Sequence, residues 1–219
     1  MMMTTGKKPD QSVLNNNKGF TLIEMAIVLI IIGIIIGAIV KGKDIIRSGE
    51  QKKIYSVFLN TWRTSYLNFY DRTGKILGDT NNDRHADTNP LHRNDPPSDS
   101  GREKLVLGDT AHQPPHYYGL SQIGLETPKT NTDKPWKYRY SDSTGEGHEM
   151  TIAFDFDPRG KYNYMRISNI PNELCIAMDT MIDGEADGAK GDFKGDGSGG
   201  KGWGTTPSDD AVARWKMDF

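Results

Sequence analysis

Two acidic stretches of the sequence place oxygen ligands two residues apart, a spacing that suits a cation. The first contains Asp79, Asn81, Asp83 and Asp87, and the second contains Asp183, Glu185, Asp187 and Asp192. A tight loop with this spacing can wrap a hard cation, as calcium loops do. Neither stretch is an EF-hand, because the glycine position of the first is Arg84 and neither has a glutamate at the twelfth position. Two interpretations stay open at each stretch, a calcium site and a solvated acidic loop, and calcium is the cofactor to test for.

A further carboxylate stands near the start of a long apolar run. Glu24 is the only charged residue from Phe20 to Val40. A helix of this length spans roughly 30 Å, the thickness of a bilayer's hydrocarbon core. A buried carboxylate is costly by itself, and a cation beside it offsets that cost. A plain anchor has no need of this group, so we expect Glu24 to have a function. The alternative is a carboxylate that only reaches the membrane interface.

The residues around this carboxylate form a motif, Lys18-Gly19-Phe20-Thr21-Leu22-Ile23-Glu24. It resembles the prepilin peptidase site of type IV pilins and of type II secretion pseudopilins, and the firm resemblance covers about residues 18 to 45. The resemblance implies cleavage after Gly19 and methylation of Phe20 as the new N-terminus. It also implies that Glu24 pairs with the free amine of a neighbouring subunit during assembly. The sequence departs from the family in having no proline near Val40, so we expect no proline kink there.

The same resemblance implies a fold, a location and partners. We expect an α+β, pilin-like fold, in which a long helix over about residues 20–72 packs on a small antiparallel sheet with long loops. Residues 1–19 would be a cleaved leader, residues 20–45 a membrane or filament core, and residues 46–219 a globular head. The protein would cross the inner membrane once, with a cytoplasmic N-terminus, before it joins a periplasmic or extracellular filament. Its partners would be prepilin peptidase, an inner-membrane assembly platform and further copies of itself.

The residue pattern by itself predicts the same elements. An apolar stripe with helical spacing continues the long helix towards a stop near Gly74. The stripe consists of Ile46, Ile54, Val57, Phe58, Trp62, Tyr66 and Phe69. Alternation and aromatic content predict strands at residues 136–140, 150–156, 162–168 and 211–218, with a short helix at 171–182. Between residues 74 and 133 the chain is rich in turns, and only residues 104–107 and 119–125 suggest order.

Composition narrows the classes of function. A net charge of −2 gives no basic surface for nucleic acid, so we expect no such partner. The single cysteine, Cys175, excludes an intramolecular disulfide, and its apolar neighbours predict a buried thiol. The histidines are expected to be solvated in loops, with a transition-metal site as the less favoured alternative. They are His85, His92, His112, His116 and His148.

These observations favour a structural protein. We expect a subunit of a type IV pilus-like or type II secretion pseudopilus filament, processed by prepilin peptidase and polymerised through its N-terminal helix. The alternative is a membrane-tethered, calcium-dependent binding module that does not polymerise. No pair of nucleophile and base and no metal triad stands out in the sequence, so we do not expect an enzyme.

Overall fold

The computed structural model describes residues 19–79, 83–86, 99–108, 119–196 and 202–218. Contacts divide the chain into two compact units, Met1–Ile46 and Arg47–Phe219. The first helix, α1 (Leu22–Lys53), begins in the first unit and ends in the second. It runs through Val40 and Gly42 without a break, as the absence of a proline there predicts.

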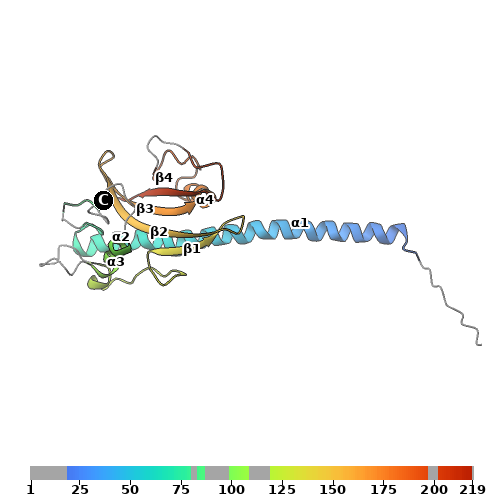
Figure 1. The fold of residues 1–219 in the computed structure, drawn as a ribbon, viewed down its shortest axis with the longest axis horizontal. Coiled ribbons are helices and arrows are strands. Elements are labelled where there is room, and N and C mark those ends of the chain that lie inside the picture. Colours follow the sequence, from blue (N-terminus) through green and yellow to red (C-terminus); the bar gives the residue numbers. More distant parts are fainter. Residues whose placement is uncertain (1–18, 80–82, 87–98, 109–118, 197–201, 219) are drawn as a thin grey trace, which may run out of the picture. The chain divides into compact units, whose positions relative to one another are not determined.

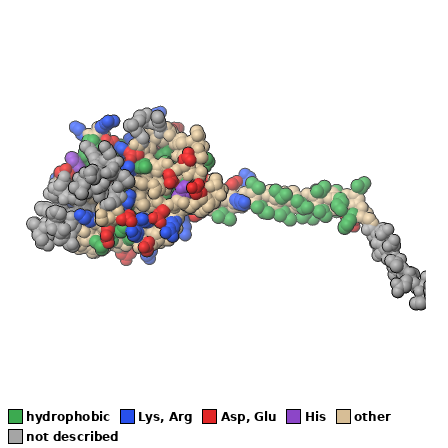
Figure 2. All heavy atoms as spheres, in the orientation of Figure 1, with side chains coloured by type: hydrophobic (Ala, Val, Ile, Leu, Met, Phe, Trp, Pro, Cys, Tyr) green, Lys and Arg blue, Asp and Glu red, His purple; other side chains and the backbone are tan. Residues whose placement is uncertain are grey.

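In the first unit, α1 is apolar on every side from Met25 to Val40. All residues from Gly19 to Lys41 are exposed in this single chain, and Figure 2 shows hydrophobic side chains along this part of the helix. By length and composition, the helical stretch Leu22–Thr73 contains a segment that could cross a membrane. A helix that is hydrophobic all round needs apolar surroundings. This part of α1 is therefore suited to insertion in lipid or to packing against similar apolar helices.

In the second unit, the helix continues in a different winding. Six residues, η1 (Ile54–Leu59), form a π-helix, and α2 (Asn60–Thr73) follows. The backbone N–H of Asn60 bonds to the carbonyl of Tyr55, five residues earlier, which is the π-helical pattern. The sequence predicts the helix but not this wider turn. The helix stops at Gly74, whose φ of 67° is left-handed, as glycine allows.

The second unit also contains a five-stranded antiparallel sheet in the order β1-β2-β3-β5-β4. The strands are β1 (Lys137–Ser141), β2 (Gly147–Asp157), β3 (Tyr162–Pro171), β4 (Phe193–Gly195) and β5 (Asp210–Lys216). Four of them confirm the predicted strands within a few residues. The sequence did not predict β4, a three-residue strand in the glycine-rich region that pairs with the sheet through β5.

The sheet packs on the helix through aromatic side chains, and Figure 1 shows the strands beside α2 and the helical residues before it. Phe58 contacts Tyr138 with ring centroids 5.1 Å apart, and Tyr66 stacks on Phe154 at 4.9 Å. The indole of Trp62 is fully buried, and its N–H donates to the Pro135 carbonyl at 3.0 Å. Five residues of the predicted stripe are buried, namely Ile54, Phe58, Trp62, Tyr66 and Phe69. The prediction is wrong for Ile46 and Val57, which remain 73% and 39% exposed in the single chain. The contacts between helix and sheet confirm the α+β, pilin-like arrangement of a long helix on a small antiparallel sheet.

Two helices outside the continuous helix Leu22–Thr73 complete the described fold, together with the 3-10 turn η2 (Ser121–Ile123). Helix α3 (Asp99–Leu107) includes the short stretch for which the sequence indicated order, and it begins five residues earlier. Helix α4 (Asn172–Ile182) confirms the predicted short helix. Cys175 lies on the buried side of α4, where loss of solvation raises the pKa of its thiol. It is a structural thiol, as predicted.

Candidate functional site

The start of α1 holds the predicted processing and assembly residues. Thr21 precedes the helix and caps it: its N–H and its hydroxyl both donate to Oε2 of Glu24, at 2.7 and 2.8 Å. In return the N–H of Glu24 donates to the Thr21 hydroxyl at 3.3 Å. This reciprocal pattern is a capping box. Glu24 therefore serves the helix that carries it, a role that the spacing Thr21-x-x-Glu24 signals and that we did not predict.

The bond between Gly19 and Phe20 lies before the helix begins. Both residues are exposed, and the side chain of Phe20 remains 79% accessible. Within the described part of the chain, and apart from Gly19 and its sequence neighbours, no atom lies within 4 Å of the place where a Cβ on Gly19 would stand. Gly19 and Phe20, which flank the predicted cleavage position, are thus both exposed in the described part of the chain.

The second acidic loop places three of its four predicted ligands around one hollow. Asp183, Glu185 and Asp187 line it, together with Lys190, whereas Asp192 does not. The carboxylate of Asp183 accepts the N–H groups of Asp192 and Phe193, at 3.1 and 2.8 Å. These bonds hold the loop closed before β4.

Asp187 closes a tighter turn within the same loop. Its Oδ1 accepts the N–H groups of Ala189 and Lys190, both at 2.8 Å. These two bonds lower the pKa of Asp187, and the bond from Lys190 has the larger effect. Part of the acidic spacing thus has a use in shaping the loop.

A buried carboxylate that the sequence did not single out lies beneath this loop. Asp179 on α4 is fully buried, and its Oδ2 accepts the N–H of Gly188 at 2.8 Å and the indole N–H of Trp203 at 2.7 Å. Among the residues that the structure describes, none donates a hydrogen bond to its Oδ1. Burial raises the pKa of this carboxyl, and the charges of Asp183 and Asp187 raise it further.

Calcium fits this region in part. Oxygen ligands gather on one hollow, and the unpartnered oxygen of Asp179 is an acceptor for which a cation would compensate. Within the described residues, however, the carboxylates of this loop do not bring three ligand atoms within 4.8 Å of one another. The loop offers suitable donors without a preformed cage.

The first acidic stretch is described only in part. Asp79 is buried, and its carboxylate accepts the N–H groups of Asp83 and Arg84, at 3.3 and 2.8 Å. Asn81 and Asp87 lie outside the described residues. The described half of this stretch is a turn that Asp79 closes.

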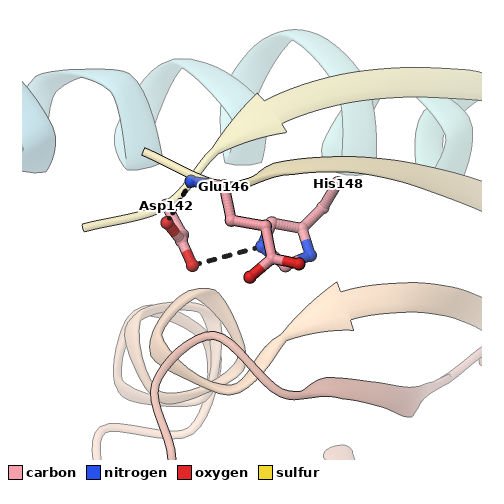
Figure 3. A group of neighbouring side chains, drawn as sticks. All are labelled: Asp142, Glu146 and His148. Atoms are coloured by element: carbon pink, nitrogen blue, oxygen red, sulfur yellow. Dashed lines mark hydrogen bonds and ion pairs between the residues drawn. The ribbon is translucent and has the colours of Figure 1, made fainter. Parts of the chain in front are cut away.

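The prediction of solvated histidines is wrong for His148. It is buried in β2, where its register partner is Tyr140, and both of its ring nitrogens face carboxylates. Its Nε2 lies 3.3 Å from Oδ2 of Asp142, and its Nδ1 lies 2.8 Å from Oδ1 of Asp210 (Figure 3 draws the first of these). His85 is exposed and stacks on Phe156. His92, His112 and His116 lie outside the described residues.

Comparison with protein-family models finds one feature, at the N-terminus. Residues 14–40 match the prokaryotic N-terminal methylation motif. Comparison with curated proteins gives no match, and comparison with solved structures gives none. The matched range contains Gly19, Phe20 and Glu24 together with the apolar part of α1. The chain therefore carries the prokaryotic N-terminal methylation motif, which is typical of type IV pilins and pseudopilins.

Proposed function

We propose that this protein is a structural subunit of a type IV pilus-like or type II secretion pseudopilus filament. The observation that carries the proposal is the methylation motif, whose matched range includes a helical segment, residues 25–40, that is apolar on every side. Such a helix leaves lipid only when equivalent apolar surfaces replace the lipid around it. A bundle of the same helices from other copies provides that surface. The role is structural, as for the proteins in which this motif is typical, and it involves no catalysis.

The proposed pathway begins in the inner membrane. The N-terminus lies in the cytoplasm, and prepilin peptidase cuts after Gly19 and frees an amine on Phe20, which is then methylated. An inner-membrane assembly platform adds the subunit to a periplasmic or extracellular filament. The amine of one subunit then pairs with Glu24 of another, because a charge buried among apolar helices needs a partner.

The capping box is compatible with this pairing. Both contacts from Thr21 reach the same oxygen, Oε2 of Glu24. Oε1 can therefore accept the amine of a neighbouring subunit while the cap stays in place. The two roles of Glu24 are separable, because capping needs an acceptor at this position and pairing with an amine needs a negative charge.

Two variants separate these roles. Glu24→Gln preserves a side chain that completes a capping box and removes the charge, whereas Thr21→Ala removes the cap and preserves the charge. We expect Glu24→Gln to be cleaved normally but to yield few or no filaments. We expect Thr21→Ala to lose about 1 kcal/mol of helix stability and still to form filaments. Electron microscopy of sheared filaments and immunoblots of the membrane fraction provide the readout, and normal filaments from Glu24→Gln would refute the proposed pairing.

A second candidate is a membrane-tethered, calcium-dependent binding module that does not polymerise. The acidic hollow and the unpartnered oxygen of Asp179 favour it. An ion bound only by the folded state stabilises that state by mass action, by about 2.7 kcal/mol at one hundred times its Kd. We expect the full chain in detergent to melt higher in calcium than in chelator. Equal melting temperatures in the two conditions would remove calcium from the account, and unaltered behaviour of Glu24→Gln would favour the tethered module over the filament.

A further inference from the structure

The turn between β1 and β2 gathers three side chains of a kind that bind metals. Asp142 follows β1, Glu146 precedes β2, and His148 is the second residue of β2. One ligand atom from each lies within 4.8 Å of the other two, and no other such group of three exists among the residues that the structure describes. Figure 3 shows the carboxylate of Asp142 and the ring of His148 turned towards one another, with the Glu146 side chain beside them.

The imidazole of His148 is held in one orientation from outside the turn. Its side chain is only 4% exposed, and its Nδ1 lies 2.8 Å from Oδ1 of Asp210, the first residue of β5. Nε2 is thereby directed at Asp142. A metal-binding histidine generally passes its other ring N–H to a carboxylate in this way, which fixes the tautomer and strengthens the ligand.

The carboxylate of Asp142 is also held in place, by hydrogen bonds that all reach one of its two oxygens. Its side chain is fully inaccessible, and Oδ1 accepts the N–H and the hydroxyl of Thr144, at 2.8 and 2.7 Å, and the N–H of Glu146 at 2.9 Å. Oδ2 is left to face Nε2 of His148 at 3.3 Å. Two ligand atoms on a tetrahedral zinc ion, each about 2.0–2.1 Å from it, also lie roughly 3.3 Å apart. The pair is therefore spaced as two zinc ligands are.

The third ligand comes from the solvent side. Glu146 is exposed, so its carboxylate can close over an ion that enters from water and can leave a fourth position for a water molecule. The other charged groups at this turn satisfy one another. Glu173 accepts the N–H of Ser143 at 3.1 Å and lies 3.7 Å from Arg47. Oδ2 of Asp142 and the carboxylate of Glu146 thus remain as oxygen ligands for a cation at Nε2 of His148, while Asp210 holds Nδ1.

We propose that Asp142, Glu146 and His148 bind a divalent transition metal of the zinc class, with Asp210 orienting the histidine. An imidazole nitrogen among the ligands suits zinc and is foreign to calcium, which takes oxygen ligands. The site is independent of the acidic loop and of the filament role, because it uses none of their residues. Bound metal would tie the β1–β2 turn to the start of β5 through His148 and Asp210. A structural ion here would act in place of the disulfide that the single cysteine excludes.

The test is zinc binding by the untagged full chain in detergent, after dialysis against chelator, followed by calorimetric titration. We expect one zinc ion per chain, not displaced by excess calcium. Glu146→Gln changes an exposed side chain and leaves the fold intact, and we expect it to weaken zinc binding at least tenfold. Asp210→Asn should weaken it by about 10–100-fold, as loss of an orienting partner does. Glu103→Gln, an exposed change on α3 outside both groups of candidate ligands, is the matched control and should bind zinc as the parent does.

Two results would overturn the proposal. The first is the absence of stoichiometric zinc in the parent chain. The second is zinc binding that Glu146→Gln leaves unchanged, which would assign the bound metal to other groups and His148 to a purely structural contact with its two carboxylates. His148→Gln should also lose zinc, and its thermal unfolding transition must be checked, because the side chain is buried.

Discussion

Individual carboxylates have different structural roles in this protein, depending on their surroundings. Glu24 caps a helix from an exposed position, Asp179 is buried with one oxygen unpartnered, and Asp99 is held by cations. The same functional group is thus a local structural element, a source of electrostatic cost, or half of an ion pair. Each environment leads to its own measurable consequence.

Asp179 is expected to destabilise the fold when it is ionised and no cation is present. Its raised pKa means that the folded state binds the proton more tightly than the unfolded state, so ionisation above the ordinary pKa lowers stability. In chelator at neutral pH, Asp179→Asn should raise the melting temperature, because an amide oxygen can still accept from Gly188 and Trp203. Asp179→Ala should lower it, because those donors lose their acceptor. If Asp179→Asn destabilises as much as Asp179→Ala, the charge itself is needed and this electrostatic argument is contradicted.

Asp99, at the start of α3, should make the fold sensitive to acid. The ammonium of Lys134 donates a hydrogen bond to the Asp99 carboxylate at 2.7 Å. This hydrogen bond is the largest cause, and the contact with Lys137 a further cause, of a pKa lowered to about 2. A depressed carboxyl pKa stabilises the fold above the ordinary value of about 4, and the effect disappears as the pH falls towards 2. Asp99→Asn should therefore flatten the fall of melting temperature over this range. Glu103→Gln, exposed on the same helix, is the control, and an unchanged acid profile for Asp99→Asn would contradict the assignment.

At the scale of elements, the central feature is the helical spine packed on the sheet. The π-helix Ile54–Leu59 changes the winding just before α2, and its buried residues still face the core, as do those of α2. An inserted residue in a helix shifts the phase of its apolar stripe. The stripe of α2 is anchored by Trp62, which combines a large buried surface with a hydrogen bond to Pro135.

Removal of this anchor should be one of the most damaging single changes in the second unit. Trp62→Ala leaves a cavity against Phe154 and an unsatisfied carbonyl on Pro135, and we expect a loss of about 3–5 kcal/mol of stability. Val57→Ala, on the adjoining π-helix and 39% exposed, should change stability far less. Thermal or denaturant unfolding of the full chain in detergent measures both. Equal effects of the two changes would contradict the packing described.

The elements that the sequence predicted are those with a strong local pattern. Helical spacing of large apolar side chains predicted the spine, and alternating aromatic and β-branched residues predicted four strands. The strand β4 was not predicted, because it has only three residues and lies among glycines, so it shows no alternation of apolar and polar residues. The surroundings of His148 could not be predicted, because its partner Asp210 is 62 residues away in the sequence, on β5, a strand that does not pair with β2. The capping box at Thr21 and Glu24 was readable from spacing alone, since four residues are enough to define it.

At the scale of the whole molecule, the two units differ in whether their apolar side chains are buried within a single chain. The methylation motif covers residues 14–40, and its match extends over the apolar part of α1. The second unit has its own core of helix and sheet, so its fold is satisfied within a single chain. The apolar helix is not, because its side chains remain exposed. The first unit thus contributes the candidate membrane-spanning segment, and the second contributes the folded core.

The central claim is that the chain is processed at Gly19 and assembles through the helix that follows. The most direct test is intact mass and N-terminal sequencing of the protein from native envelopes or sheared filaments. We predict a mature chain that begins at Phe20 and carries one methyl group on its amine. A mature chain that still begins at Met1, in cells with an active prepilin peptidase, would contradict the account.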